Sequence, residues 1–303
     1  MKRKIIIAGG SGFLGSLLIK KYDTGNNEIV ILTRRKSYKH KNISYVNWDA
    51  VTLSDWLADL EGGDIIINLV GKSVNCRYTE SNKKEIIDSR VNATLAIGRA
   101  INKLKQPPKV WINAGSAAIF GNSGDEIKDE YSETGNGFSP GVCKQWEAAF
   151  NSIETPYTRK IFLRIGLVLQ KNEGLLKPFT RLVKFGLGGK IGSGEQYLSW
   201  IHEKDFIKVV EVAISNEAIK GIVHCTSPFP VTNKDFMKAL RLVCNMPFGI
   251  PGPAPFTKIG ATLIGTEAEL VLTGRRVVSK VLEEKKFRFE YENLENALRD
   301  LIN

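Results

Sequence analysis

A glycine-rich loop near the start of the chain places the strongest constraint on the fold. The sequence Gly9-Gly-Ser-Gly12-Phe-Leu-Gly15 follows a short apolar segment and opens a helical pattern. In a strand–loop–helix unit this is typical of a dinucleotide-binding site, although the spacing is Gly-x-x-Gly-x-x-Gly rather than the commoner Gly-x-Gly-x-x-Gly. The first glycine permits a tight turn, the second lets backbone N–H groups approach a pyrophosphate, and the third lets the helix pack closely on the strand. The helix N-terminus adds a favourable dipole.

The alternative interpretation is a loop whose glycines serve packing alone. A P-loop is excluded because no Gly-Lys-Ser/Thr follows. If the loop binds a dinucleotide, the residues expected to contact it are Gly9, Gly10, Ser11, Gly12, Phe13, Leu14 and Gly15.

The end of the second apolar segment predicts which dinucleotide is bound. A site for NAD(H) usually has Asp or Glu here, about twenty residues after the loop, to accept a hydrogen bond from the ribose 2′-hydroxyl. This chain has Thr33 followed by Arg34 and Arg35. A carboxylate would repel a 2′-phosphate, whereas arginine can pair with it bidentately. NADP(H) is therefore favoured, and the alternative is that the two arginines only solvate a strand end.

Short apolar runs alternate with helical patterns through the first half of the chain. This alternation predicts an α/β fold with a doubly wound parallel sheet of the Rossmann type. The expected strands are Lys4–Ala8, Glu28–Thr33, Ile43–Val46, Asp64–Val70, Lys109–Ala114 and Lys160–Ile165. The expected helices are Phe13–Tyr22, Ser81–Lys105 and Val142–Ser152.

The pattern changes after about Gly166, which predicts a Rossmann domain over residues 1–166 and a smaller α/β substrate lobe over 167–303. The lobe includes a C-terminal segment, 247–303, which starts in a proline-rich stretch. That stretch is either a linker or a surface excursion. The elements expected in the lobe are helices at Asp205–Ser215 and Asn233–Val243, a strand at Gly221–Cys225, and short helices around a strand-like Phe287–Tyr291.

Composition excludes several classes of protein. No run approaches the ~18 apolar residues of a membrane helix, and the short apolar start, interrupted by glycines, is not a signal peptide, so the cytoplasm is expected. Four cysteines without a CxxC pair and three separated histidines argue against disulfides and metal sites. The net charge of +11 is spread along the chain, so a small anionic molecule is expected rather than nucleic acid. A homodimer is compatible with the sequence.

Further motifs resemble the extended short-chain dehydrogenase/reductase superfamily. Asp49 follows the third strand, Asn68-Leu69-Val70-Gly71 ends the fourth, and Val91-Asn92 lies in the long helix. In that superfamily, residues at these places line the cofactor. The match is closer to an atypical branch, the nucleoside-diphosphate-sugar epimerase-like proteins with a small C-terminal domain of unknown function. The resemblance covers the whole chain and is carried by Arg77-Tyr-Thr79, Asp88-Ser-Arg90, Cys143-x-x-Trp-Glu147, Leu163–Leu169, Ser199–His202 with Asp205, Ser227–Asn233, Lys280–Leu282 and Phe287–Tyr291.

The usual catalytic pair of the superfamily is missing. Its dehydrogenases use Tyr-x-x-x-Lys with a Ser or Thr, and the lysine lowers the tyrosine pKa. Ser116 matches the serine, but the tyrosine and lysine positions hold Ser139 and Cys143. The atypical branch also lacks the pair. The adjacent Lys144 is no replacement, since one residue along a helix turns a side chain by about 100°.

Other residues are candidates for the missing chemistry. His202 has a suitable pKa, and Tyr78 offers a phenol; the alternatives are a hydrogen-bonded structural histidine and a packing tyrosine. Arg77, Arg90 and Arg164 are candidates to bind an anionic substrate group or the cofactor, or each is one half of an ion pair. Cys143 is interpreted as a small buried filler.

Two functions follow from this pattern. The first is an NADP(H)-dependent oxidoreductase or epimerase on a small carbonyl, hydroxyl or sugar-nucleotide-like substrate, with Ser116 polarising the reacting oxygen. The alternative is a non-catalytic sensor of the NADPH/NADP+ ratio. A hydrolase is disfavoured because no Gly-x-Ser-x-Gly elbow is present.

Overall fold

One sheet of eight strands forms the centre of the protein. The computed structural model describes residues 3–171, 173–263, 265 and 267–302. The sheet order is β12-β8-β6-β5-β1-β2-β4-β3, and every neighbouring pair is parallel except β3 and β4. The strands are β1 (Lys4–Ala8), β2 (Glu28–Thr33), β3 (Tyr38–His40), β4 (Ile43–Asn47), β5 (Ile65–Asn68), β6 (Val110–Ser116), β8 (Arg159–Ile165) and β12 (Gly221–Cys225). The predicted doubly wound α/β fold is confirmed.

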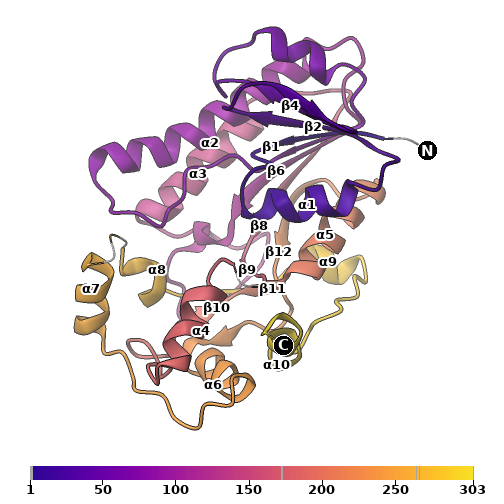
Figure 1. Ribbon diagram of the computed structural model, residues 1–303. Coiled ribbons are helices and arrows are strands. Elements are labelled where there is room, and N and C mark those ends of the chain that lie inside the picture. The colour runs from indigo at the N-terminus through magenta and orange to yellow at the C-terminus, as the bar shows by residue number, and fades with distance from the viewer. Residues whose placement is uncertain (1–2, 172, 264, 266, 303) are drawn as a thin grey trace.

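Helices cover both faces of the sheet (Figure 1). On one side lie α1 (Phe13–Tyr22) and α5 (Glu203–Ser215), and on the other α2 (Glu80–Ile101) and α3 (Phe138–Asn151). Because both faces are covered, central strands such as β1 are apolar throughout, and Ile5, Ile6 and Ile7 have no exposed surface.

The lower part of Figure 1 is built from shorter elements after β8. A second apolar core there joins α4, α6 and α10 through residues such as Phe179, Phe236 and Leu298. The remaining elements are η1 (Asp55–Leu60), η2 (Ala117–Phe120), β7 (Ile127–Lys128), β9 (Leu167–Leu169), α4 (Leu176–Lys184), β10 (Tyr197–Leu198), β11 (Trp200–His202), β13 (Val231–Thr232), α6 (Asn233–Val243), α7 (Ala254–Leu263), α8 (Glu269–Leu272), β14 (Arg276–Val277), α9 (Lys280–Glu284) and α10 (Leu294–Ile302). No helix in the described part of the chain is long and apolar enough to cross a bilayer.

The chain after residue 166 contributes to both parts. It supplies α5 and β12 to the sheet layer. The domain boundary at residue 166 stays a prediction. Residue 303, the last of the predicted lobe, lies outside the described residues. The proline-rich stretch is hydrogen-bonded to the preceding glycine-rich loop: Gly189 N–H donates to Ile250, and Ile250 N–H donates to Gly186. At Ile250 the proline-rich stretch is therefore a surface segment packed on the rest of the fold.

Local structure differs from the sequence-based expectations at several places: α3 begins at Phe138 rather than Val142, and two segments differ in kind. Strand β3 was not expected, because all three of its residues are exposed and give no apolar signal. The predicted strand at Phe287–Tyr291 is wrong. Its backbone has another partner, since the N–H groups of Glu290 and Tyr291 donate to the buried carboxylate of Asp205, at 2.7 and 2.9 Å.

Candidate cofactor and substrate site

A cleft of about 750 Å³ lies at the carboxyl edge of the sheet. It opens beside the junction of β1 and β5, where the strand order reverses and open α/β sheets bind their ligands. The cleft is lined from the ends of β1, β2, β4 and β5 by Gly9, Ser11, Gly12, Leu32, Thr33, Arg34, Arg35, Trp48, Asp49, Ala50, Val51, Leu69, Val70, Gly71, Lys72 and Ser73, and from α2 by Glu85, Asp88, Ser89 and Asn92.

The glycine loop has the close contacts that its sequence predicts. Gly9 has a φ of +80°, and a Cβ there would lie 2.9 Å from the carbonyl carbon of Leu69. A Cβ on Gly15 would lie 2.5 Å from the Cα of Gly10, so the helix can approach the strand only without a side chain. Gly12 caps α1 and offers no side-chain acceptor, which leaves N–H groups at the helix start for an anion. These features fit a dinucleotide pyrophosphate.

Two exposed arginines stand at the corner of the cleft where β2 ends. Arg34 and Arg35 both line the cleft. The Thr33 hydroxyl accepts from Arg35 N–H at 3.2 Å, and Asn47 Nδ2 donates to the Arg35 carbonyl at 2.9 Å. The backbone is therefore held while the guanidinium groups stay in solvent, which suits an incoming phosphate.

Asp49 shapes the neighbouring wall. Its carboxylate accepts from the N–H groups of Val51 and Thr52, both at 2.8 Å, and from the Thr52 hydroxyl at 2.5 Å. The Thr52 hydroxyl, followed by these two N–H groups, lowers the pKa of Asp49 below its ordinary value. The residue thus orders the loop after β4 at the rim of the cleft.

A buried polar network supports the loop after β5. Asn68 Nδ2 donates to Asn113 Oδ1 at 2.7 Å, and Asn68 Oδ1 accepts from Val70 N–H at 3.1 Å. Trp146 Nε1 donates to the Thr94 hydroxyl at 3.0 Å. Because the side chains of Asn68, Asn113, Thr94 and Trp146 are all buried, this network fixes α2 and α3 against the sheet beneath the cleft.

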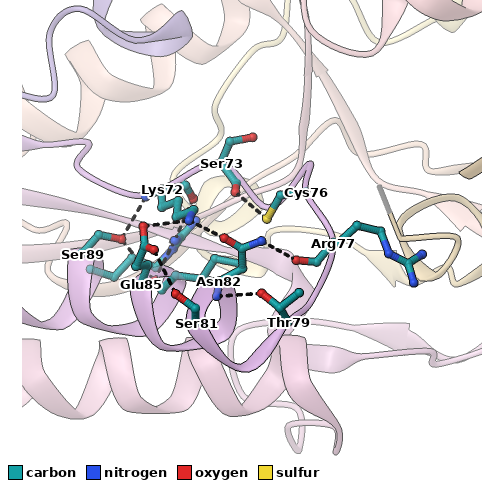
Figure 2. A network of polar contacts seen from close by, with 11 residues as sticks. Lys72, Ser73, Cys76, Arg77, Thr79, Ser81, Asn82, Glu85 and Ser89 are labelled. Atoms are coloured by element: carbon teal, nitrogen blue, oxygen red, sulfur yellow. Dashed lines mark hydrogen bonds and ion pairs between the residues drawn. The ribbon is translucent and has the colours of Figure 1, made fainter. Parts of the chain in front are cut away.

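The same loop is tied to α2 further along (Figure 2). Lys72 Nζ contacts Asn82 Oδ1 at 2.6 Å and Glu85 Oε2 at 2.7 Å, and Ser89 accepts from the Lys72 N–H. The Arg77 side chain extends away from this network in Figure 2. It pairs with Glu267, at 3.6 Å, so it joins the loop to the C-terminal segment.

Ser116 and the two vacant positions of the catalytic pair lie around the start of α3. Ser116 ends β6, and its Oγ accepts from the Ala118 N–H at 3.1 Å, which leaves the hydroxyl proton to be donated elsewhere. The next element, η2, packs on α3 at Cys143. Burial, and then the Glu147 carboxylate, raise the pKa of Cys143 to about 12, so this thiol is neutral and acts as an apolar filler.

Tyr78 reaches the same turn of α3 from the loop after β5. Its ring lies 4.7 Å from that of Phe138, and its hydroxyl is covered without a hydrogen-bond partner among the described residues. Burial raises the pKa of Tyr78, while the neighbouring Ser139 hydroxyl acts in the opposite direction. Ser139 Oγ itself donates to Glu269, at 3.3 Å. A protonated phenol therefore occupies space beside the vacant tyrosine position.

His202 makes the contacts of a structural histidine. It is fully buried, and its Nδ1 caps α5 by accepting from Lys204 N–H at 3.1 Å. The ring stacks on Tyr291 at 3.8 Å, and Nε2 lies 3.3 Å from Asp300. Burial lowers the pKa of His202 to about 4, so the ring is neutral at pH 7. None of these partners lines the cleft.

The two other predicted arginines differ from each other. Arg164 is buried and forms a bidentate pair with Glu147, at 2.7 and 2.8 Å, as the ion-pair alternative anticipated. Arg90 donates to the carbonyls of Lys72 and Ile86 and lies over the Trp146 ring, 5.2 Å from its centroid.

Some residues at the site were not among the predicted ones. Lys72, Asp88 and Ala50 line the cleft, and Arg275 enters near α3 from the C-terminal segment. Arg275 is one of two adjacent arginines outside any motif, so only the folded chain identifies it.

Comparison with known proteins assigns the chain to a family. An epimerase family protein of Bacillus subtilis, YfhF, is 35% identical over 98% of this chain and 97% of its own length. Residues 5–145 match the NAD dependent epimerase/dehydratase family. The chain belongs to this epimerase family. A second match, over residues 253–301, is to a domain of unknown function, DUF1731. The resemblance inferred from the sequence motifs is therefore confirmed.

Other members of the epimerase family are similar along most of their length. The chloroplastic SDR39U1 homolog of Arabidopsis thaliana is 29% identical over 98% of this chain and 86% of its own. The crystal structure of human SDR39U1, isoform 2, with NADPH matches with a TM-score of 0.87, 26% identity and 98% coverage of both chains. The family match includes the glycine loop, the cleft and the start of α3, and the DUF1731 match includes α7 to α10.

Proposed function

We propose that this protein is an NADP(H)-dependent oxidoreductase acting on a small carbonyl or hydroxyl compound. The observation that carries the proposal is the cleft above the glycine loop, whose β2 corner presents Arg34 and Arg35 where an NAD(H) site would have a carboxylate. The NADPH in the human SDR39U1 structure supports this choice of cofactor. We further propose a cytoplasmic location; a homodimer stays a prediction.

The chain would contribute binding and proton transfer. NADP(H), when bound, supplies or accepts a hydride. Arg34 and Arg35 would pair with the 2′-phosphate, and the N–H groups at the start of α1 would hold the pyrophosphate. Ser116 donates a hydrogen bond to the reacting oxygen, and Tyr78 supplies the proton that turns a carbonyl into a hydroxyl. The Tyr78 ring contacts Phe138 at the start of α3, and η2, which directly follows Ser116, packs on the same helix. Because burial raises the pKa of Tyr78, the phenol stays protonated at neutral pH, which is the form that can donate a proton.

Replacing Arg34 and Arg35 together with Ala is expected to weaken NADPH binding roughly 10- to 100-fold, the usual range for losing charge-assisted contacts to a phosphate. NADH binding should change much less because it lacks the 2′-phosphate. Fluorescence titration measures both constants, and Lys103→Ala, which removes an exposed charge after α2, is the matched control. Equal weakening of both cofactors would contradict the assignment.

Replacing Ser116 with Ala is expected to lower turnover about 10²- to 10³-fold, as when one donor to a developing oxyanion is removed. The measurement is NADPH oxidation at 340 nm over a panel of carbonyl compounds. NADPH affinity should be unchanged. Turnover by wild type that survives the substitution would reject the role of Ser116.

A non-catalytic sensor of NADP(H) is the second candidate. The observation that favours it is the vacant catalytic pair, because Ser139 and a neutral, buried Cys143 cannot replace a tyrosine and a lysine. Tight NADPH binding without turnover on any member of the panel would support the sensor and reject the oxidoreductase.

A further inference from the structure

Among the described residues, two arginines beside α3 have no carboxylate partner, unlike two other arginines nearby. Arg164 pairs with Glu147, and Arg77 contacts Glu267. For Arg90 and Arg275, no carboxylate oxygen lies within 4.0 Å among the residues that the structure describes. We call these two the arginine pair.

Arg90 lies on α2, and one nitrogen of its guanidinium group is held by backbone carbonyls. Its Nη1 donates to the Lys72 carbonyl at 3.0 Å and to the Ile86 carbonyl at 2.9 Å. The group lies over the Trp146 ring and against Gly71, where a Cβ would be 3.0 Å from the guanidinium carbon. Burial lowers the pKa of Arg90, but arginine remains charged at neutral pH. Among the described residues, its hydrogen bonds come from Nη1 alone.

Arg275 comes from the segment before β14, and its backbone is fixed on both sides. Its N–H donates to the Tyr197 carbonyl at 3.0 Å, and its own carbonyl accepts from Ser199 Oγ at 2.8 Å. In the side chain, Nη2 donates to the Thr273 hydroxyl at 3.2 Å. Burial lowers its pKa, and the nearby Cys143 and Glu269 act in the opposite direction. Glu269 lies beyond ion-pair distance and accepts from Ser139.

The arginine pair converges on the vacant catalytic positions. Trp146, under Arg90, lies one helical turn after Cys143 on the same face of α3. Cys143 belongs to the same apolar cluster as Val277, two residues after Arg275. The Cys143 thiol and the Tyr78 phenol lie close enough to both arginines to affect their pKa values. The two cations therefore both lie in the neighbourhood of Cys143 and Tyr78.

Partly buried cations without a counter-charge reduce stability unless an anion compensates them. The planar guanidinium fork matches the oxygens of a carboxylate or a phosphate. We propose that Arg90 and Arg275 bind an oxyanion group of the substrate, placing its carbonyl beside Tyr78. This inference rests on the proposed function and names the substrate class: a small carbonyl compound that carries a carboxylate or a phosphate.

The test is thermal unfolding of the full chain saturated with NADP+, so that Arg34 and Arg35 are already occupied. Oxalate, inorganic phosphate and the neutral oxamide are titrated at constant ionic strength. We expect oxalate or phosphate, but not oxamide, to raise Tm in a saturable way, and the stronger of the two identifies the class. Equal responses to oxamide, or no saturable response, would overturn the proposal.

Arg275→Gln should weaken the binding of that anion at least ~10-fold, whereas the neighbouring Arg276→Gln should retain it, since Arg276 lies over the Tyr197 ring. Without the anion, Arg275→Gln should unfold at the same temperature as wild type or higher. A lower Tm with anion binding retained would mean that Arg275 is structural. If the variant does not fold, Arg275→Lys is tested in its place. Weaker oxalate or phosphate binding than wild type supports anion binding by the arginine pair, and binding equal to wild type rejects it.

The two proposals fail separately. If NADP+ does not change Tm, the cofactor assignment is lost. The anion titration is then repeated without cofactor on the Arg34→Ala/Arg35→Ala variant. A rise in Tm with the anion supports the arginine pair only if adding Arg275→Gln to this variant abolishes it.

Discussion

Replacing Glu147 with Gln is expected to lower the free energy of unfolding by about 3–5 kcal/mol, the range for breaking a buried ion pair from one side. The carboxylate contacts Arg164 through both oxygens, and the Arg164 side chain is only 4% exposed. Arg164 has a second polar neighbour, His224, whose Nε2 lies 3.4 Å from Arg164 Nη1. A histidine ring cannot replace the negative charge of Glu147. The substitution therefore leaves a buried guanidinium without a counter-charge.

Denaturant unfolding at pH 7 measures this loss. Glu154→Gln removes an exposed carboxylate near the end of α3 and should change stability by less than about 0.5 kcal/mol. The double variant Glu147→Gln/Arg164→Met removes both charges and should recover part of the loss. A single variant as stable as wild type would show that the pair contributes no net stability.

Replacing Tyr78 with Phe is expected to lower the rate of NADPH-dependent reduction about 10²- to 10⁴-fold, the usual contribution of a general acid. The ring contact with Phe138 is retained and only the covered hydroxyl is lost, so the fold should not change. Because burial raises the pKa of Tyr78, the wild-type rate should not fall as the pH increases through the neutral range.

The measurement is single-turnover NADPH oxidation with the best substrate from the carbonyl panel. Tyr157→Phe is the matched control, because that side chain is 83% exposed. The control should keep the wild-type rate. If Tyr78→Phe also keeps it, the proton comes from another group or from water.

The sheet was predictable from the sequence because its strands are covered on both faces. β1, β2 and β12 begin and end as expected, and so do α1 and α6. Buried parallel strands give continuous apolar runs, and glycines mark where they meet helices. β3 gave no such signal because its side chains are all exposed.

The polar interior was much less predictable, because each charge finds its partner through tertiary folding. His202 resembled a catalytic base in the sequence, yet its neighbours Asp300 and Tyr291 come from almost a hundred residues later. Arg164 and Arg90 looked equivalent, and only the position of Glu147 distinguishes them. Arg275 had no motif, and its place near α3 follows from the path of the C-terminal segment.

The buried carboxylate of Asp205 has a consequence for how the chain unfolds. It lies in the first turn of α5, on the sheet, but it holds the N–H groups of Glu290 and Tyr291 just before the final helix. Detaching the C-terminal segment would leave this carboxylate without its two backbone donors, with only Lys208 at 3.9 Å, and would uncover the His202 ring. The Asp205 carboxylate therefore opposes fraying of the C-terminal segment. The amide hydrogens of α10 should exchange together with those of α5, as one cooperative unit.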